Sequence, residues 1–528
     1  MTQARFSIGI DLGTTNCAVA FVPLDGEAKS ELLAVPQRET LTSLVESPSL
    51  PSFLYLPEAA VAAEIQRDDA GQREWIVGRF ARNKAPESPG RVVHSAKSWL
   101  CHHTADRSAR FLPWGSEDIV RDQKISPVCA SALILNYLKD AWNRQFGDSE
   151  SEFNRQDITI TVPASFDAAA QQLTIAAAMD AGFPETVRLL EEPQAALYCW
   201  LERHDLAKEL WVKPPDQNTG AHHLLVIDIG GGTSDFSLFE CRSDARNPVP
   251  EIRRVAVSEH ILLGGDNVDL AIARLAESRL LGHGGQFSGG QWDQLVARCR
   301  DLKEKVLSSD GQAHETFKIA LPGRGSDLIA GISSAQLTRA EIESTLLEGF
   351  FPECDASARP YRTQVALREW GLSYASDAAV TRHLADFLRD RPRVDAVLFN
   401  GGSLHPRLLH ERICQQIGKW QGDVPPLALQ NSEPAFAVAR GAARSGKLVY
   451  RKAKRIAAGA AHAIFLEVHG KPATYRGTDR SVPGLCSPAR RLARGAIRNR
   501  RPSARAPHQP ACTLPGLLLW PPGEESRG

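Results

Sequence analysis

The sequence lacks any excess of charge of one sign, because its 528 residues include 62 Lys and Arg and 62 Asp and Glu. A net charge of zero provides no general electrostatic attraction to nucleic acid. The sequence also lacks an apolar run near the roughly 20 residues that cross a bilayer, and its N-terminus has no basic-then-apolar signal pattern. We therefore expect neither a membrane protein nor a protein that binds specific nucleic acids.

Paired cysteines are missing as well. The ten cysteines are scattered singly, without a CxxC pair, which favours a reduced, cytoplasmic compartment over a disulfide framework. Cys101-His102-His103 has no second cluster at zinc spacing, so we expect no zinc site there. With 43% hydrophobic and 23% charged residues, the composition is typical of a soluble globular protein with about two to four compact units.

The most informative segment is a glycine-rich turn between two apolar runs. Residues 228–235 have the sequence DIGGGTSD and separate the apolar runs 224–227 and 236–239. Such runs on both sides of a turn predict a hairpin of two strands. Three adjacent glycines let the backbone turn tightly and approach a ligand closely. The two aspartates and the threonine hydroxyl add groups suited to phosphates and a hydrated divalent cation.

A second segment near the N-terminus repeats this chemistry. The apolar run 6–10 is followed by DLGTTN at 11–16 and then by the apolar run 18–22. One such hairpin alone would be an ordinary turn in most proteins. Two hairpins with the same groups, far apart in the sequence, favour a duplicated fold with one phosphate-binding hairpin in each half.

The two hairpins resemble the phosphate motifs of the actin-like ATPase superfamily, and they are most similar to those of the DnaK-type seventy-kilodalton heat-shock chaperones. The resemblance extends over roughly residues 5 to 450. It implies an α/β fold in which duplicated ribonuclease-H-like domains form two lobes around a nucleotide cleft. Further segments that match the family in order and approximate spacing are 158–183, 188–200, 261–272, 337–343, 399–406 and 431–443.

The resemblance also implies a division of the chain. Residues 1–212 would form lobe I, and residues 213–426 would form lobe II, with an insertion near 350–385. Residues 427–450 would form a closing helix that returns to lobe I, and 451–528 would form a degenerate or disordered basic tail. We find no trace of the family's peptide-binding β-sandwich, nor of the apolar linker that precedes it.

The tail differs in composition from the rest of the chain. Residues 471–528 contain 11 Lys and Arg against 3 Asp and Glu, with many Pro, Ala and Gly. Such a segment buries too little apolar surface to offset its ordering entropy. We interpret it as a disordered tail or the product of a reading-frame change, with a nucleic-acid-binding arm as the weaker alternative.

For the site, the resemblance implies ATP or ADP with Mg²⁺, and K⁺ as a second candidate cation. Asp11, Asp228 and Asp235 would surround the metal. Lys97 would reach the γ-phosphate and Glu192 would orient the attacking water, while Pro163 would relay the nucleotide state. Thr233 and Asp235 complete the implied catalytic set. The implied phosphate contacts are Gly13, Thr14, Thr15, Asn16, Gly230, Gly231, Gly232 and Thr233.

The implied nucleoside contacts depart further from the family pattern. After Gly401-Gly402-Ser403 the family has threonine and an arginine that covers the adenine, whereas this chain has Leu404 and His405. His405 or Arg407 would cover the base instead by stacking or a cation–π contact. The remaining implied contacts are Gly264, Gly265, Lys305 and Ser308.

The segment 441–447 imitates the spacing of a P-loop. It is followed by Leu448 rather than Ser or Thr, and no strand leads into it. We expect it to fall at the end of a helix over 435–444, with Gly446 as the C-cap.

Three functions remain open from the sequence. The first is an ATP-hydrolysing, heat-shock-like chaperone protein whose partners are co-chaperones or client proteins. The second is a nucleotide-gated scaffold without chaperone activity. The third is a sugar or acetate kinase, for which we find no motif with a catalytic aspartate on the substrate hydroxyl.

Overall fold

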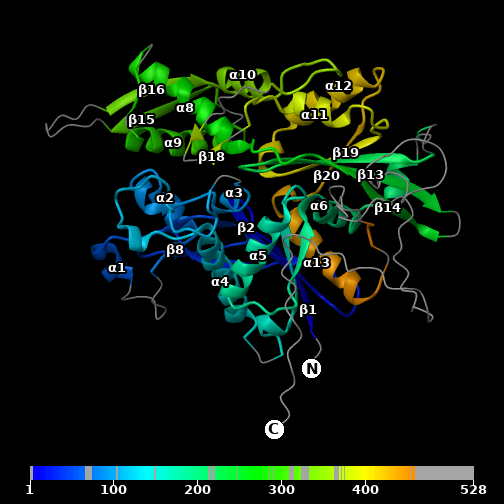
Figure 1. The fold of residues 1–528 in the computed structure, drawn as a ribbon, viewed down its shortest axis with the longest axis horizontal. Helices are drawn as coiled ribbons and strands as arrows, with labels where there is room; N and C mark the ends of the chain where they lie inside the picture. Colours follow the sequence, from blue (N-terminus) through cyan, green and yellow to red (C-terminus); the bar gives the residue numbers. More distant parts are fainter. Residues whose placement is uncertain are drawn as a thin grey trace, which may run out of the picture. The chain divides into compact units, whose positions relative to one another are not determined.

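The computed structural model describes residues 4–457 except 66–73, 103–104, 148–149, 212–215, 217–219, 245–246, 283–284, 288, 308–313, 323–331, 362–367, 370–371, 374 and 454. All of these described residues belong to one compact unit, Met1–Gly459 (Figure 1). Most of the basic tail that the sequence predicts lies outside the described residues. None of the helices in the described ranges is both long and apolar enough to cross a membrane.

The first sheet is built on the N-terminal hairpin. β1 (Phe6–Asp11) and β2 (Asn16–Pro23) pair antiparallel, with Asp11 opposite Ala18. β10 (Asp157–Val162) and β11 (Arg188–Glu191) then extend the sheet in parallel on the side of β1. The complete order is β11-β10-β1-β2-β3, with β3 at Glu31–Leu32 antiparallel to β2.

The second sheet repeats this topology. β12 (His222–Ile229) and β13 (Ser234–Asp244) form the antiparallel hairpin that holds the second glycine turn. β14 (Asn247–Val257) pairs antiparallel with β13, while β19 (Ala396–Asn400) and β20 (Leu427–Gln430) are parallel. The order β14-β13-β12-β19-β20 therefore matches β3-β2-β1-β10-β11 in both order and direction. The predicted duplication is present in the sheet topology.

Long amphipathic helices cover the sheets. α4 (Pro127–Gln145) begins at Ser126, whose hydroxyl accepts a hydrogen bond from Cys129 N, and it packs against α5 (Ala168–Asp180). α9 (Gly289–Leu307) packs against α8 (Gly265–Leu281). The buried face of α9 contains Leu295, Cys299, Leu302 and Val306, as its sequence periodicity predicts.

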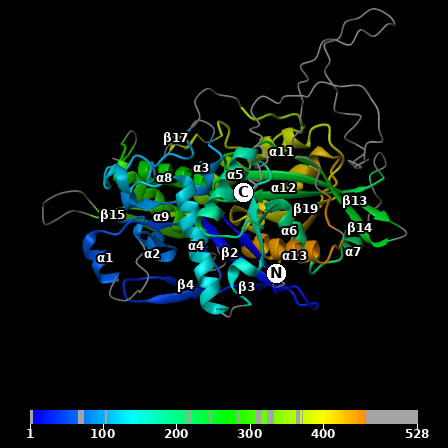
Figure 2. The same ribbon diagram turned by 60° about the horizontal axis from the view of Figure 1, so that its bottom comes forward.

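Helix α13 (Ala437–Tyr450) crosses β1, β2 and β10 and lies against α6 (Glu192–Leu201) (Figures 1 and 2). Small residues allow this close approach, because a Cβ added at Gly9 or Gly441 would overlap the backbone of the facing element. The prediction for Gly446 is wrong. Gly446 lies inside α13 rather than at its end. It packs against Ser7, which leaves no room for a side chain at this position.

The proposed insertion near 350–385 follows α10 (Arg339–Phe350). Its described part lacks long elements until α11 (Val380–Leu388), and Asp377 accepts a hydrogen bond from Tyr361 N at 2.9 Å. The two short strands β17 (Arg368–Glu369) and β18 (Leu372–Ser373) pair with each other. Part of this segment lies outside the described residues.

The other helices are α1 (Ala59–Ile65), α2 (Arg79–Lys84), α3 (Ala96–Leu100), α7 (Leu206–Leu210) and α12 (Arg407–Trp420). Short helical turns lie at Pro89–Arg91, Arg121–Gln123, Phe153–Arg155, Gly402–Leu404 and Pro434–Phe436. The remaining strands are β4 (Val35–Arg38), β5 (Leu44–Ser47), β6 (Leu50–Pro51), β7 (Leu54–Tyr55), β8 (Ile76–Val77), β9 (Val92–Val93), β15 (Thr316–Pro322) and β16 (Ile332–Thr338).

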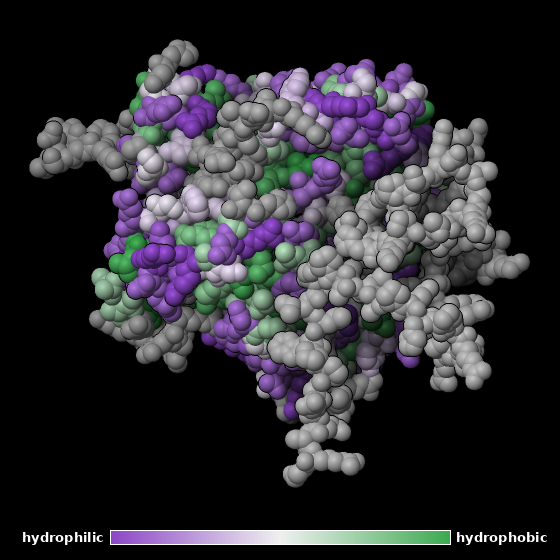
Figure 3. Space-filling model, in the orientation of Figure 1, coloured by the Kyte–Doolittle hydropathy of each residue, from purple (hydrophilic) through white to green (hydrophobic). Residues whose placement is uncertain are grey.

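The core is continuous from one sheet to the other. The same cluster of buried residues includes Ile8 and Ile10 of β1 and Leu225 and Ile227 of β12. On the face shown in Figure 3, most of the described surface is hydrophilic, and the hydrophobic residues form only scattered patches. The apolar side chains of both sheets thus pack inside the protein.

We predict that Gly441→Ala destabilises the protein, although alanine in place of glycine favours a helix by about 1 kcal/mol. The added methyl group would overlap the backbone of Ala195 in α6, and overpacking of this kind costs typically about 1–3 kcal/mol. The matched control is Gly349→Ala in α10, where nothing lies within 4 Å of the added Cβ. Thermal unfolding of both variants tests this. A melting temperature for Gly441→Ala at or above that of wild type would contradict the packing.

Candidate functional site

A cavity of about 400 Å³ lies where the two glycine turns meet. The turn after β1 contributes Gly13 to Asn16, and the turn after β12 contributes Gly230, Gly231 and Thr233. A third turn, at 401–403 after β19, completes this end of the cavity. Further lining residues named by the sequence analysis are Asp11, Lys97, Glu192, Asp228, Gly264, Gly265 and His405.

The two glycine turns touch each other. A Cβ at Gly231 would overlap the Thr15 hydroxyl, and a Cβ at Gly232 would lie 3.3 Å from Thr14 Cγ2. The first turn is held from behind by Ser52, whose hydroxyl donates to Gly13 O at 2.7 Å and whose amide donates to Thr15 O at 2.8 Å. The glycines are therefore required by close approach of one turn to the other.

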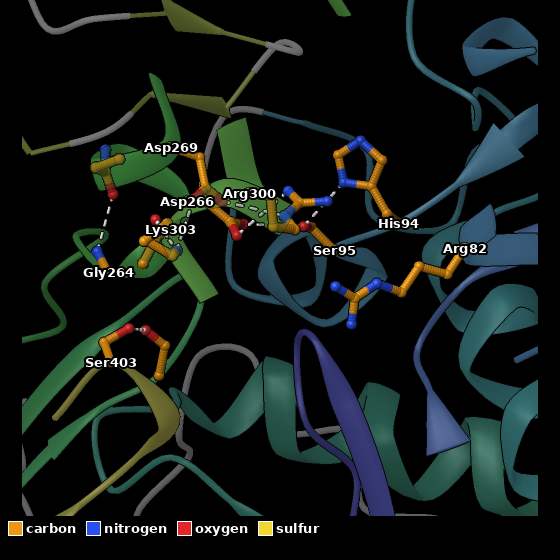
Figure 4. A network of polar contacts seen from close by, with 12 residues as sticks. Arg82, His94, Ser95, Gly264, Asp266, Asp269, Arg300, Lys303 and Ser403 are labelled. Atoms are coloured by element: carbon orange, nitrogen blue, oxygen red, sulfur yellow. Dashed lines mark hydrogen bonds and ion pairs between the residues drawn. The ribbon is translucent and has the colours of Figure 1, made fainter. Parts of the chain in front are cut away.

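The second turn is fixed against α8 and the third turn. Gly265 N donates to Gly230 O at 3.0 Å, and Asp266 N donates to Gly231 O at 2.7 Å. The Ser403 hydroxyl also donates to Gly230 O, at 2.8 Å (Figure 4). Gly230 N–H is used within the turn, where it donates to Thr233 O at 2.9 Å. Of the predicted phosphate donors, the Gly230 amide is thus already engaged.

An acidic cluster faces the cavity from the ends of the strands. Asp11 ends β1, Asp228 is the penultimate residue of β12, and Glu192 begins α6. Removal from water and the charge of Glu192 raise the pKa of Asp11 to about 7. The same two causes raise the pKa of Asp228, while a 2.9 Å hydrogen bond donated by Asn400 Nδ2 opposes this. The ionised carboxylates are therefore disfavoured in this cluster unless a cation lies beside them.

Lys97 provides one positive charge to the cluster. It lies in α3, is buried, and forms an ion pair with Glu192. Burial alone would lower the pKa of the Lys97 ammonium, but the Glu192 and Asp11 carboxylates outweigh burial and raise it. A charged lysine thus lies beside the carboxylates at the cavity wall.

Asp235 lies behind the cavity wall rather than on it. It is only 2% exposed, and its Oδ1 has no hydrogen-bond partner among the described residues. Burial raises the pKa of Asp235 to about 7, although hydrogen bonds from Ser165 and the charge of Lys97 counteract it. Thr233 separates Asp235 from Gly232 and is itself buried.

The donor set suits a hydrated cation. Within the described ranges, no group of three or more His, Cys, Asp or Glu side chains is arranged to bind a metal ion directly. Carboxylates with raised pKa values nevertheless attract a cation, and Mg²⁺ retains several of its water ligands when it binds beside phosphates. Asp11 and Asp228, which line the cavity, therefore fit a magnesium ion held mainly through water, whereas Asp235 lies behind the cavity wall.

An ion-pair network closes the opposite wall of the cavity. Arg300 contacts Asp266 at 3.5 Å and Asp269 at 3.1 Å, and Lys303 contacts Asp269 at 2.6 Å. Ser95, which precedes α3, donates to Asp266 Oδ2 at 3.1 Å (Figure 4). Asp266, Asp269, Arg300, Lys303 and Glu304 all line the cavity, and the sequence analysis named none of them as a site residue.

One predicted nucleoside contact lies away from this cavity. Lys305 does not line this cavity and lies instead in a groove between α9 and β15. Lys303 faces the cavity, where it donates to Gly265 O at 2.8 Å. Helical periodicity could have identified Lys303 from the sequence. Lys303 follows the buried Cys299 by four residues and therefore lies one turn along the same helix face. Ser308 lies outside the described residues.

His405 and Arg407 are separated by their positions. His405 lines the cavity, whereas Arg407 is 89% exposed and pairs with Glu411 at 3.2 Å along α12. Of the two predicted base contacts, only His405 is therefore positioned to reach a ligand in the cavity. The apolar part of this end is formed by Leu263, Val268, Leu307, Leu346, Phe350, Phe351, Val380, Pro406, Pro434 and Phe436.

Comparison with known proteins adds one finding. The family model described as Hsp70 protein matches residues 70–358, which are 289 of the 528 residues. The match includes Lys97, Glu192, Asp228 and the second glycine turn. The first glycine turn and the third turn lie outside it, and the structure brings both to the same cavity.

We predict that Asp235→Asn stabilises the nucleotide-free, metal-free protein at pH 8. A folded-state pKa near 7, against about 3.9 when unfolded, means that ionised Asp235 destabilises the fold. This penalty grows as pH rises from 4 to 7 and is constant above pH 7. The expected gain in the free energy of unfolding at pH 8 is on the order of a few kcal/mol. This gain should shrink towards pH 5. Denaturant unfolding at both pH values measures it, with the exposed Asp180→Asn as control. A gain of equal size at both pH values would refute the buried charge as its cause.

Proposed function

The chain belongs to the Hsp70 family, and from this premise we propose that it binds ATP together with a hydrated magnesium ion and hydrolyses it slowly. The observation that carries the proposal is the meeting of two glycine turns, from sheets of the same topology, beside carboxyl groups with raised pKa values at one cavity. A polyphosphate with its cation would satisfy both features, since amides bind the phosphates and carboxylates bind the hydrated metal.

We also propose the finer architecture of the family for this chain. Residues 1–212 would form lobe I and residues 213–426 lobe II, with 427–450 as the closing helix and the nucleotide cleft between the lobes. Two properties support this division. Each half contains one sheet with the same strand order, and the cavity is lined by residues from both halves.

The proposed chemistry depends mainly on charge and position, because phosphoryl transfer needs little covalent help from the protein. Bound magnesium would neutralise phosphate charge next to Asp11 and Asp228. Lys97 would stabilise the charge that develops on the γ-phosphate. Glu192 forms an ion pair with Lys97, and it would orient the attacking water once phosphate competes for that lysine.

The base would lie at the apolar end of the cavity. His405 is the ring that lines this end from the third turn, and Phe350 and Val268 contribute apolar surface. Arg407 is directed away from the cavity in its pair with Glu411. Stacking on His405 with apolar contact would recognise the shape of a base more than its hydrogen-bonding edge, so selectivity for adenine would be loose.

At the level of the whole protein we propose a heat-shock-like chaperone that works through its ATPase domain in the cytoplasm. Its partners would be co-chaperones or client proteins. Release of ADP in the absence of any sugar or acetate acceptor would distinguish hydrolysis from kinase activity.

We predict that Asp11→Ala and Asp228→Ala each reduce affinity for magnesium-ATP by at least about 10-fold. Each change removes one carboxylate that would hold the hydrated cation, and a charged hydrogen-bonding group is worth on the order of 1.5–3 kcal/mol. Isothermal titration with magnesium-ATP measures this, and the exposed Asp180→Ala is the control. Wild-type affinity in both site variants would show that the carboxylates do not serve a nucleotide.

We predict that Glu192→Gln slows hydrolysis by about 100-fold or more, as expected for a group that positions water in the transition state, while affinity for ATP changes little. Single-turnover hydrolysis and titration on the same preparation separate the two effects. Because Glu192→Gln leaves buried Lys97 without its partner, thermal unfolding of the variant checks that the fold is intact. If the affinity for ATP falls by the same factor as the hydrolysis rate, Glu192 contributes to ground-state binding of ATP instead.

A further inference from the structure

An open groove of about 490 Å³ lies between α9 and β15 and shares no lining residue with the nucleotide cavity. One wall is a face of α9, on which Arg298, Leu302 and Lys305 follow one another at helical spacing. The other wall is formed by residues 316–320 of β15. In Figure 1, β15 and β16 lie at one end of the molecule, beside α8 and α9.

The strand β15 has an edge that no other described strand covers. Among the described residues it pairs only with β16, in an unbroken antiparallel register. Arg339 N donates to Glu315 O at 2.9 Å, which continues this ladder by one pair. Hydrogen-bonded and non-hydrogen-bonded pairs alternate along an antiparallel ladder. The N–H and C=O groups of Thr316, Lys318 and Ala320 therefore point away from β16.

A proline marks the end of this outward row. Pro322 occupies the next outward position, and proline has no N–H to donate. It is tolerated there because an outward N–H takes no part in the ladder with β16. The outward groups from Thr316 to Ala320 lie along the groove. An uncovered row of this kind can form hydrogen bonds with an added strand.

The groove also carries positive charge. Arg298, Lys305 and Lys318 line it, together with a single carboxylate, that of Asp301. The Asp301 carboxylate already pairs with Arg82 of α2 at 3.0 Å. Arg298 Nε is buried and has no hydrogen-bond partner among the described residues. A carboxylate that entered the groove would accept a hydrogen bond from Arg298 and approach both lysines.

We propose that this groove binds an extended, acidic segment of a partner protein, which adds a strand to the free edge of β15. Backbone hydrogen bonds to Thr316, Lys318 and Ala320 would hold the segment, while its carboxylates would pair with the basic side chains of the groove. The buried Leu302 would contact an apolar side chain of the segment. A second copy of this chain suits the groove less well, because paired β15 edges would bring two Lys318 side chains onto one small sheet. The inference does not depend on nucleotide binding.

The first test uses a fluorescein-labelled peptide of alternating glutamate and valine, which has one acidic and one apolar face when extended. We expect it to bind the full chain at least about 10-fold more tightly than a matched peptide of lysine and valine. Fluorescence anisotropy measures both affinities. Failure of the glutamate peptide to bind, or equal binding of the two peptides, would overturn the proposal.

The second test distinguishes strand addition from simple attraction of charges. Alternate amides of an added strand face β15, and the different faces of the peptide fix its register. N-methylation of one set of amides, either all glutamates or all valines, should therefore abolish binding, while N-methylation of the other set should be tolerated. Both methylated peptides keep the charge of the parent peptide. Equal affinities for the two methylated peptides would contradict strand addition.

Variants of the protein locate the binding site, which is necessary because residues 471–528 are also basic. Lys318→Glu should weaken binding of the glutamate peptide by about 5-fold at low ionic strength. The matched control is Lys208→Glu, which makes the same change of charge at a lysine of α7 that is 82% exposed. Wild-type affinity in Lys318→Glu, or an equal loss in both variants, would show that the peptide binds elsewhere.

A backbone variant tests the edge itself. Ala320→Pro should abolish peptide binding, because it removes one outward N–H and leaves the ladder with β16 intact. Thermal unfolding checks the fold of this variant, and Lys318→Glu tests the site independently of it. Sedimentation of wild type and Ala320→Pro examines the second copy as the occupant. A wild-type dimer that Ala320→Pro abolishes would overturn the choice of an acidic partner.

Discussion

Burial of the carboxyl groups at the ends of β1 and β12 is the constraint on which the rest of the site depends. Asp11 and Asp228 occupy similar positions in two sheets of the same topology, so the duplication itself brings two acidic groups to one cavity. Removal from water, followed by the charge of Glu192, raises the pKa of Asp11 to about 7, so its ionised form is disfavoured unless a cation lies beside it. This electrostatic cost supports the proposed magnesium-nucleotide site, because a bound cation would favour the ionised carboxylates.

The glycine turns around these carboxyl groups are closely packed, and their shape is largely determined by how closely other atoms approach their backbone. Gly231 and Gly232 are necessary because the hydroxyls of Thr15 and Ser98, respectively, occupy the space that a Cβ would need. The carbonyls of the second turn are held by α8 and the third turn. These hydrogen bonds hold the turn in place, and such preorganisation reduces the ordering cost of binding a ligand.

Local sequence predicted the features that depend on neighbouring residues. The two hairpins and the buried face of α9 follow from patterns within a few residues, and both are present. Lys303 lines the cavity and Lys305 lies outside it, and the family resemblance that implied Lys305 gives no information on which helix face meets the cavity. Gly446 failed because its packing against Ser7, about 440 residues away in sequence, determines why glycine is there. When the role of a residue depends on a partner far away in the sequence, the neighbouring residues do not reveal that role.

The ion-pair network and the hydrogen bonds of His260 belong to this second class. Arg300 is buried, which is unfavourable for a guanidinium unless acids surround it, and Asp266 and Asp269 do so from α8. An isolated arginine in an amphipathic helix gives no indication of such partners. The same holds for His260, whose contacts come from segments about 95 and 159 residues away. The position of such a histidine is recognisable only once the sheets are assembled, because its partners lie far from it in the sequence.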